Sequence, residues 1–269
     1  MSGSHPDPTT RLDRLPRTIG APATRGLAAA GFTELRQLVG VPSEELAGLH
    51  GVGPKALRII REELQLITRH HDEGEVVYVD ARPTDDQLRV VEPDHSWPQH
   101  FDQLAEQVAR TLGDRVVEIH HVGSTSVAGL PAKPIIDVDV VVADPADEAA
   151  YVPDLQGLGL VHWLTEPDWH QHRLFKRLAR ERHEPRVHLH VFGPGCPEVV
   201  RHLMFRDWLR AHPEDRERYA AAKREALAAL DATGAEHGAL GSGMRYNAFK
   251  EPVVHEIYDA MFRAAGLPR

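Results

Sequence analysis

Hydrophobic and polar residues alternate along the chain with two different periods, and each period predicts a different kind of element. Apolar side chains recur at helical spacing over residues 97–112, which predicts an amphipathic helix. Residues 186–192 alternate between polar and apolar side chains, as a strand with one buried face does. Residues 135–142 are almost continuously apolar, which predicts a strand buried on both faces. The chain therefore combines helices with a sheet.

Further periodic segments extend this mixed pattern. They predict strands over residues 116–121, 160–164 and 173–178, and helices over residues 151–158, 199–211, 217–231 and 251–265. Strands mixed with helices and followed by a helical tail favour the α+β class.

The first part of the chain has a different pattern, which predicts a division into domains. Residues 15–68 carry short apolar groups at helical spacing and predict a small all-α domain of four or five short helices. The polar residues 1–14 are expected to be disordered. Residues 69–88 form a charged linker, in which the apolar stretch Val76–Val79 is either an edge strand or a tether. Residues 89–269 then form the large α+β domain.

Charge is divided unevenly between these parts. Residues 1–70 hold nine of the 31 Lys and Arg residues and seven of the 40 Asp and Glu residues, so their net charge is +2. The remaining 22 basic and 33 acidic residues leave residues 71–269 at −11. A part this acidic is not a general binder of polyanions, and a nucleotide would need a local pocket and a metal ion to be held there.

Cysteine content and hydropathy restrict the compartment. Cys196 is the single cysteine of the 269 residues, so no intramolecular disulfide is available. No apolar run approaches the roughly 20 residues that span a bilayer, and the polar N-terminus lacks the apolar core of a signal peptide. We expect a cytoplasmic protein without a membrane partner.

The strongest chemical signal is a turn of small residues followed by paired carboxylates. Gly123, Ser124, Thr125 and Ser126 form a Gly-Ser turn whose backbone N–H groups would approach a phosphate closely, with a helix start adding positive potential. Asp137-Val-Asp139 follows on the predicted buried strand, where residues i and i+2 share one face. Two carboxylates on one face are hard oxygen ligands for Mg²⁺ or Mn²⁺. The order of the two motifs favours phosphoryl or nucleotidyl chemistry with a divalent cation.

Each half of this signal also has an ordinary structural interpretation. Gly-Ser-Thr-Ser alone is a common loop, and Asp-x-Asp alone often marks the exposed face of an edge strand. Here the aspartates interrupt an apolar run, where burial of a carboxylate is costly unless a cation or hydrogen-bond donors compensate for it. That cost favours the functional interpretation.

A family resemblance rests on these motifs and their flanks. The segment His121-Val-Gly-Ser-Thr-Ser-Val-Ala-Gly-Leu-Pro-Ala-Lys-Pro-Ile-Ile-Asp-Val-Asp, with Val91-Glu-Pro-Asp and Trp97-Pro before it and His188-Leu-His-Val after it, resembles the GrpB family. The resemblance extends to Phe205-Arg-Asp-Trp-Leu-Arg-Ala-His-Pro and covers about residues 88–263. That family is grouped with the nucleotidyltransferase-fold superfamily. The resemblance implies a nucleotidyltransferase-like mixed sheet flanked by helices, and it implies the fold more firmly than the reaction.

The chain departs from the superfamily pattern on one strand. His188 and His190 lie where the superfamily usually has its third carboxylate. Imidazole suits Mn²⁺, Zn²⁺ or Fe²⁺ better than Mg²⁺. The site therefore uses a softer metal with Asp137, Asp139, His188 and His190 as ligands, or His190 is a general base, or nucleotidyl transfer has been lost. Alternatively, both histidines are structural.

Three basic residues are candidates for holding a triphosphate. Lys133 lies four positions before Asp137, and Arg245 and Lys250 lie in a segment that resembles the C-terminal part of the family. Each is equally compatible with an ordinary solvated position. Arg206 and Arg210 lie one turn apart on a predicted helix and are more typical of salt-bridged side chains. We treat Asp168, His170 and His172 as chance clustering, since the chain has 18 histidines.

The small domain carries its own motif. Leu49-His-Gly-Val-Gly-Pro-Lys-Ala56 resembles the hairpin of a helix-hairpin-helix module, and the whole segment is similar to the C-terminal domain of the RNA polymerase α subunit. The resemblance implies that Gly51, Gly53 and Lys55 contact a phosphate of a nucleic acid or else a protein partner.

The leading hypothesis is a metal-dependent enzyme that uses ATP or another NTP to nucleotidylate or adenylate-activate a small molecule or nucleic acid. In it Asp137, Asp139 and His190 are the catalytic residues, and Mg²⁺ or Mn²⁺ is the cofactor. The alternative is a noncatalytic nucleotide-binding sensor that docks on nucleic acid or protein through the helix-hairpin-helix segment. Metal-dependent pyrophosphate release distinguishes the two.

Overall fold

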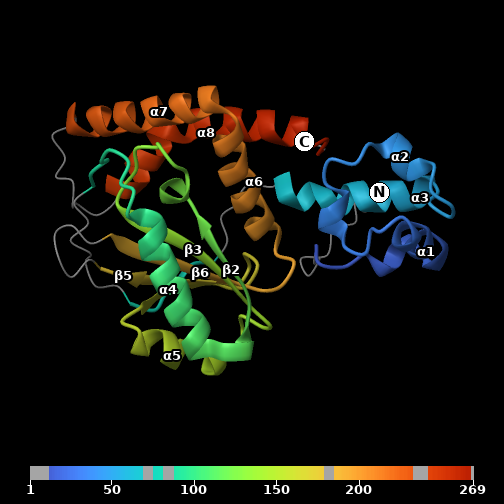
Figure 1. Ribbon diagram of the computed structural model, residues 1–269, viewed down its shortest axis with the longest axis horizontal. Helices are drawn as coiled ribbons and strands as arrows, with labels where there is room; N and C mark the ends of the chain where they lie inside the picture. The colour runs from blue at the N-terminus through green and yellow to red at the C-terminus, as the bar shows by residue number, and fades with distance from the viewer. Residues whose placement is uncertain (1–11, 69–74, 81–87, 179–184, 233–241, 268–269) are drawn as a thin grey trace.

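The computed structural model describes residues 12–68, 75–80, 88–178, 185–232 and 242–267, and its centre is a six-stranded mixed sheet (Figure 1). The strand order is β1-β4-β5-β6-β3-β2, and only the β3–β6 pair is parallel. The strands are β1 (Val77–Tyr78), β2 (Val116–Val122), β3 (Ile135–Val142), β4 (Val161–Glu166), β5 (His172–Arg177) and β6 (Arg186–Phe192). The α+β class is confirmed.

The register of the two central strands places the polar residues of both on one face. In the parallel β3–β6 pair Asp137 lies opposite His188, and Asp139 lies opposite His190. Because strand side chains alternate between faces, their apolar neighbours point to the other side of the sheet. One face therefore carries polar groups at the point where the other carries the core.

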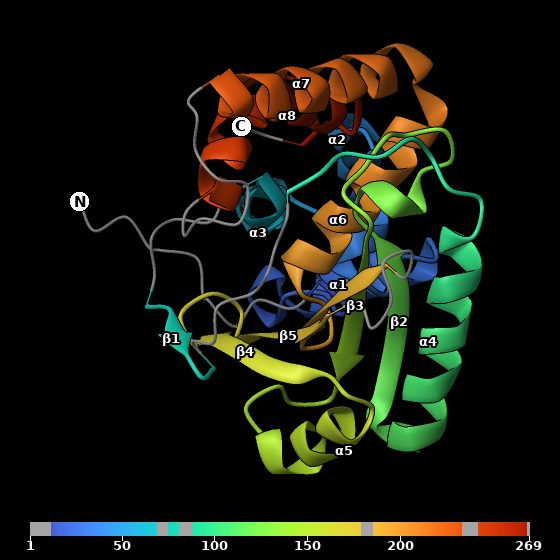
Figure 2. The ribbon, with the colours of Figure 1, turned by 90° about the vertical axis from the view of Figure 1, so that its left-hand side faces the viewer.

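The apolar face is covered by α4 (Trp97–Leu112) and α5 (Val152–Gly157). The amphipathic helix expected over residues 97–112 is confirmed with the same bounds, and its buried side includes Leu104 and Val108. These residues pack against the apolar side chains of β3 and β6 to form one hydrophobic core. Figure 2 shows α4 and α5 along this side of the sheet.

The polar face is covered by the helical tail. α6 (Pro197–Ala211) packs next to the sheet, and α7 (Pro213–Ala232) and α8 (Ser242–Ala264) pair with each other beyond it (Figure 2). Proline at the start of α6 and of α7 is favourable because the first helical N–H has no partner within the helix. The expected helices at 199–211 and 217–231 thus begin two and four residues earlier.

The N-terminal helices share a core with the tail. A 3-10 turn (Leu35–Leu38) lies between α1 (Ala21–Ala29) and α2 (Ser43–Ala47), and a short loop joins α2 to α3 (Pro54–Leu64). The buried residues of these helices pack with Met261 and Phe262 of α8. Figure 1 shows them beside α6 and the end of α8. The N-terminal helices therefore pack against the rest of the protein and are not connected to it only through the linker.

The boundary expected at residue 15 is wrong. Residues 1–11 lie outside the described part of the chain, but Leu12 is completely buried, and its backbone N–H donates a hydrogen bond of 2.8 Å to the carbonyl of Gly195. Burial of an apolar side chain together with a backbone bond orders this residue. The folded part begins before residue 15.

The segment expected to be a linker contains the edge strand. Val77 of β1 pairs with Thr165, and Tyr78 pairs with Leu164, in an antiparallel ladder with β4. Residues 69–74 and 81–87 of this segment lie outside the described ranges. Of the two alternatives, the edge strand is the one that forms.

Candidate functional site

The Gly-Ser turn lies directly against the first aspartate. Gly123 has φ +66°, and a Cβ atom at this position would lie 2.2 Å from Oδ2 of Asp137. Only glycine permits both that conformation and that approach. The turn continues into a single 3-10 turn, Ser124–Ser126, and not into the expected α-helix. A helix dipole therefore contributes little here, and positive potential must come from side chains.

Two of the four predicted turn residues hold the turn itself. The Thr125 hydroxyl donates to the carbonyl of Ile135 at 2.9 Å, and the Ser126 hydroxyl donates to the carbonyl of Gly123 at 2.6 Å. Both side chains are buried. Gly123 and Ser124 are therefore the turn residues left to meet a ligand.

Arginines of α6 also shape the turn. Arg206 donates to the carbonyl of His121 at 3.1 Å, and Arg210 donates to the carbonyl of Ser126 at 2.8 Å. Both guanidinium groups also bond to Asp207. These contacts explain the pair as fixing the turn on α6, which favours the salt-bridged interpretation over substrate binding.

A lysine that sequence reasoning missed contacts the turn from α7. Lys223 is only 2% exposed, and its Nζ donates to Oγ of Ser124 at 2.7 Å and to the carbonyl of Pro131 at 3.0 Å. Burial lowers the pKa of Lys223 well below its usual value, and the neighbouring Lys250 and Lys133 lower it further. Its position was visible in the sequence as a lysine on the buried side of a helix, in line with Tyr219.

The predicted lysines gather with Lys223 around two tyrosine rings. Nζ of Lys133 lies 5.3 Å from the ring centroid of Tyr246, and Nζ of Lys250 lies 5.7 Å from that of Tyr219. Nζ of Lys223 lies 4.1 Å from the ring centroid of Tyr219. We call Lys133, Lys223 and Lys250 the lysine cluster. Lys133 and Lys250 supply near Lys223 the positive charge that the short turn lacks, whereas Lys223 itself contributes a hydrogen bond to Ser124.

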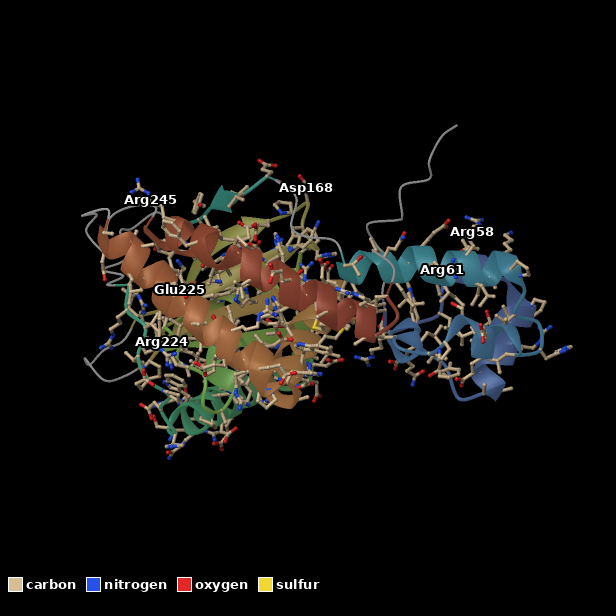
Figure 3. All side chains as sticks on the ribbon, turned by 90° about the horizontal axis from the view of Figure 1, so that it is seen from above. Arg58, Arg61, Asp168, Arg224, Glu225 and Arg245 are labelled. Atoms are coloured by element: carbon tan, nitrogen blue, oxygen red, sulfur yellow. The ribbon has the colours of Figure 1, made fainter. Side chains whose placement is uncertain are left out.

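Arg245 does not join this cluster. Its side chain is exposed on α8 and points away from the body of the molecule in Figure 3. The structure therefore brings together Lys133 and Lys250 of the predicted phosphate-binding set, but not Arg245.

The two aspartates occupy different environments. Asp139 is completely buried; its Oδ2 accepts a hydrogen bond of 2.8 Å from Nδ1 of His202, while its Oδ1 has no hydrogen-bond partner in the described part of the chain. Asp137 is partly exposed, and its Oδ1 lies 3.5 Å from Nδ1 of His188. A buried carboxylate oxygen without a partner is costly, and a cation would compensate for it.

The available carboxylates fit a cation that is bound partly by the protein and partly by the substrate. Within the described ranges no three His, Cys, Asp or Glu side chains are arranged to hold a metal ion by themselves. Mg²⁺ commonly takes one or two carboxylates and completes its shell with water and substrate phosphates. Asp137 and Asp139 on one face, with the Gly123 turn against Asp137, suit that mode of binding.

The histidines expected to act as metal ligands are already engaged with other side chains. Nδ1 of His190 lies 2.9 Å from Nε2 of His172, and Nδ1 of His172 lies 2.6 Å from Oε2 of Glu166. Burial, followed by the nearby His172, lowers the pKa of His190 well below its usual value, so its ring is neutral. His172, which we had treated as chance clustering with Asp168 and His170, is therefore joined to the site.

The hairpin motif of the small domain forms the connection between α2 and α3. Gly51 has φ +83°, and a Cβ there would lie 2.6 Å from the carbonyl oxygen of Pro22, so the turn requires glycine. Gly53 is the N-cap of α3, and Lys55 is exposed in its first turn. Arg58 and Arg61 on the same helix reach into solvent in Figure 3.

Membrane-spanning helices are both long and apolar. None of the described helices is both long and apolar enough to cross a bilayer.

Comparisons with known proteins place the large domain in a family. The family model described as GrpB protein matches residues 87–260. UPF0157 protein BH1888 of Halalkalibacterium halodurans is 45% identical over 151 residues, which are 56% of this chain and 75% of that protein. The dephospho-CoA kinase of Mycolicibacterium paratuberculosis is 29% identical over 197 residues, 64% of this chain but only 45% of that protein.

A solved structure is similar as well. The crystal structure of conserved protein GrpB from Enterococcus faecalis matches 64% of this chain and 98% of that chain, with a TM-score of 0.49 and 22% sequence identity. The family model covers well over half of the residues, and the relative from Halalkalibacterium halodurans is similar over most of its own length. The chain belongs to the GrpB family.

Proposed function

We propose that this protein is a metal-dependent nucleotidyltransferase that uses ATP or another NTP. The observation that supports this most directly is the packing of the Gly123 turn against Asp137, with the lysine cluster beside Ser124. A Gly-Ser turn, two carboxylates and lysine side chains thus lie close together at one edge of β3, which supports a site for phosphate and metal. Charge neutralisation and positioning are the main requirements of phosphoryl chemistry.

Asp137 and Asp139 would hold Mg²⁺ or Mn²⁺, which when bound neutralises charge on the phosphates. An oxygen of the acceptor attacks the α-phosphorus, the bond from that phosphorus to the bridging oxygen breaks, and pyrophosphate leaves. The lysine cluster stabilises the charge of the leaving pyrophosphate. When the acceptor is a hydroxyl group, His190 receives its proton, whereas a carboxylate acceptor attacks without losing a proton. The acceptor is a hydroxyl or carboxylate group of a small molecule or nucleic acid.

The similarity to proteins named dephospho-CoA kinase supports a nucleotide-related role without extending to kinase activity. The similar region is less than half of the mycobacterial protein. This chain contains no G-x-x-x-x-G-K-[ST] sequence, so it lacks the phosphate-binding loop of P-loop kinases. The proposal therefore takes only nucleotide recognition from this similarity.

One observation favours a second candidate, a noncatalytic nucleotide sensor. A histidine, His190, replaces the third carboxylate, and its Nδ1 is already paired with His172. In this case the segment around Gly51 and Lys55 would act as a helix-hairpin-helix and dock the protein on nucleic acid or a protein partner. Nucleotide binding without turnover is the result that separates the sensor from the enzyme.

The test uses the full chain stripped of metal. It is incubated with each NTP, with Mg²⁺, Mn²⁺ or Zn²⁺, and with a metabolite extract as the source of acceptor, and released pyrophosphate is measured. Asp139→Asn and Asp137→Asn should each lower turnover by a factor of about 100 or more, the size expected when transition-state charge loses its stabilisation. Asp168→Asn is the matched control, because this aspartate is exposed and outside the site (Figure 3).

Stability measurements check that the loss of turnover comes from the lost carboxylate charge and not from unfolding. Asp139→Asn removes a buried charge whose Oδ1 has no partner among the described residues, so the free energy of unfolding should stay the same or rise. Nucleotide binding without pyrophosphate release in any combination would support the sensor instead. Failure to bind any nucleotide, with or without metal, would refute both proposals.

A further inference from the structure

Three side chains from adjacent strands form a hydrogen-bonded string on the polar face. Glu166 ends β4, His172 begins β5, and His190 lies in β6 next to β3. The distances are 2.6 Å from Oε2 of Glu166 to Nδ1 of His172 and 2.9 Å from Nε2 of His172 to Nδ1 of His190. His172 is 6% exposed, and its ring stacks on the ring of Phe192 with ring centroids 4.8 Å apart. The string is therefore held rigidly.

For a neutral His172 ring, donor and acceptor rules assign the protons along the string. A carboxylate oxygen only accepts, so Nδ1 of His172 carries a hydrogen and donates to Glu166. In a neutral imidazole the other nitrogen then accepts, so Nε2 of His172 receives its bond from a hydrogen on Nδ1 of His190. His190 is left with a lone pair on Nε2.

That lone pair lies within the candidate site. His190 is in register with Asp139, and its ring centroid lies 6.1 Å from that of His202, the histidine that donates to Asp139. In the described part of the chain nothing hydrogen-bonds to Nε2 of His190. A carboxylate or other acceptor that bonds to one ring nitrogen of a functional histidine commonly fixes its tautomer and orientation in this way.

We propose that Glu166 and His172 are positioning residues that hold His190 with its proton on Nδ1, so that Nε2 is presented as an acceptor beside Asp139. What Nε2 acts on rests on the proposed function, whereas the tautomer does not. Glu166 and His172 both lie outside the Gly-Ser and Asp-x-Asp motifs.

The competing explanation is that the string serves only packing. A packing role depends on the shape of the His172 ring and its stack with Phe192, which phenylalanine would reproduce. A positioning role depends on the nitrogens, which phenylalanine lacks. His172→Phe therefore separates the two explanations.

The direct readout is the tautomer of His190 by ¹⁵N NMR of the ring nitrogens, with its signals assigned by their loss in His190→Gln. In the unchanged protein Nδ1 should be the protonated nitrogen and Nε2 the unprotonated one. In His172→Phe the bond that selects this form is gone, so the two tautomers should mix. Turnover should fall about 10- to 100-fold in kcat with little change in KM, which is typical of losing a residue that orients a functional histidine.

His162→Phe is the matched control. His162 is also a buried strand histidine stacked on a phenylalanine, Phe175, with centroids 4.8 Å apart, but it bonds to Thr165 and lies outside the string. This substitution should leave both the His190 tautomer and kcat unchanged. A His190 tautomer that is the same in His172→Phe as in the unchanged protein would overturn the inference.

A second variant provides a test that remains valid if His172→Phe fails to fold. Glu166→Gln keeps the shape of the string but gives His172 a partner that both donates and accepts, so the preference for Nδ1–H on His190 should weaken. Because the NMR readout needs no nucleotide, it separates the two proposals. A tautomer change in His172→Phe or Glu166→Gln without any pyrophosphate release would support the positioning role and count against the enzyme. Protonated Nε2 in the unchanged protein would overturn the positioning role whatever the turnover.

Discussion

The two faces of the central strands differ in what they contribute, although they come from alternate residues of the same segments. Val138, Val140 and Leu189 point to the face under α4 and α5 and are completely buried in one apolar core. Asp139 and His190, one position along, point to the face under α6. The first face stabilises the fold through burial of apolar area, whereas the second carries groups that burial makes costly.

The stability of the fold and the proposed chemistry therefore depend on different faces of the same strands. Apolar burial is non-directional and scales with area, so the α4 side tolerates changes of side chain that preserve volume. The polar side depends on individual atoms, such as the bond from His202 to Asp139. Substitutions at adjacent positions of one strand should therefore have effects of different kinds.

The largest expected effect on stability belongs to Leu189→Ala. Leu189 is completely buried in the core with α4, so the truncation leaves a cavity and should lower the free energy of unfolding by about 2–5 kcal/mol. His188→Ala, one position earlier and partly exposed, should cost less than about 1 kcal/mol. Urea denaturation of both variants measures the difference. Equal losses of stability at the two positions would show that the faces are not energetically distinct.

A buried histidine on the apolar face gives a pH-dependent test. His121 stacks on Phe101 of α4, with ring centroids 4.6 Å apart, and its Nε2 lies 3.1 Å from the Thr125 hydroxyl. Burial lowers the pKa of His121 from 6.5 to about 4. The negative charge of Asp137 opposes this shift, and the two arginines of α6 reinforce it. The folded protein therefore keeps this ring neutral at pH values where the unfolded chain protonates it.

The sign of the effect follows from the bound protons. Between pH 6.5 and about 4 the unfolded state binds more protons at His121 than the folded state, so the contribution of this residue to stability is full above pH 6.5 and falls as the pH falls to about 4. The loss amounts to roughly 3 kcal/mol at most. Urea denaturation at several pH values should show that the free energy of unfolding depends less steeply on pH in His121→Gln. The same slope in both proteins would contradict this explanation.

The sequence predicted the elements that have one dominant period. The helix over residues 97–112 and the strand over residues 186–192 have the expected bounds, because each has a regular apolar pattern along its length. Asp137 and Asp139 were found for the same reason, since carboxylates that interrupt an apolar strand stand out. Their shared face follows from the period of a strand.

The parts of the site that sequence did not predict come from tertiary contacts between distant segments. Lys223 reaches Ser124 from 99 residues away, and His172 meets His190 from 18 residues away. Neither neighbour follows from local spacing. The sequence offers no reason to single out His172 among 18 histidines, whereas the pairing of β5 with β6 is what brings it next to His190. Burial of Lys223 on α7 was a readable signal, but its partner was not.

The boundary of the small domain shows the same limitation. Composition and charge separated residues 15–68 from the rest of the chain, yet the two parts share a hydrophobic core that includes Phe262. A polar contact also joins them: Nη1 of Arg36 lies 3.2 Å from Oε1 of Glu118 on β2. Glu118 also lies 2.7 Å from Nε2 of His120. The polar face thus includes contacts that attach the small domain as well as the candidate site.

The smallest expected effect is at that attachment. The Arg36 and Glu118 side chains are 38% and 26% exposed, so solvent screens the pair, and Arg36→Ala should lower the free energy of unfolding by no more than about 1 kcal/mol. Pyrophosphate release should not change, because Arg36 contacts neither the Gly-Ser turn nor the aspartates. A double-mutant cycle with Glu118→Ala gives the coupling energy of the pair. A coupling well above about 1 kcal/mol, or a fall in turnover, would mean that the attachment of the small domain and the site act as one unit on the polar face.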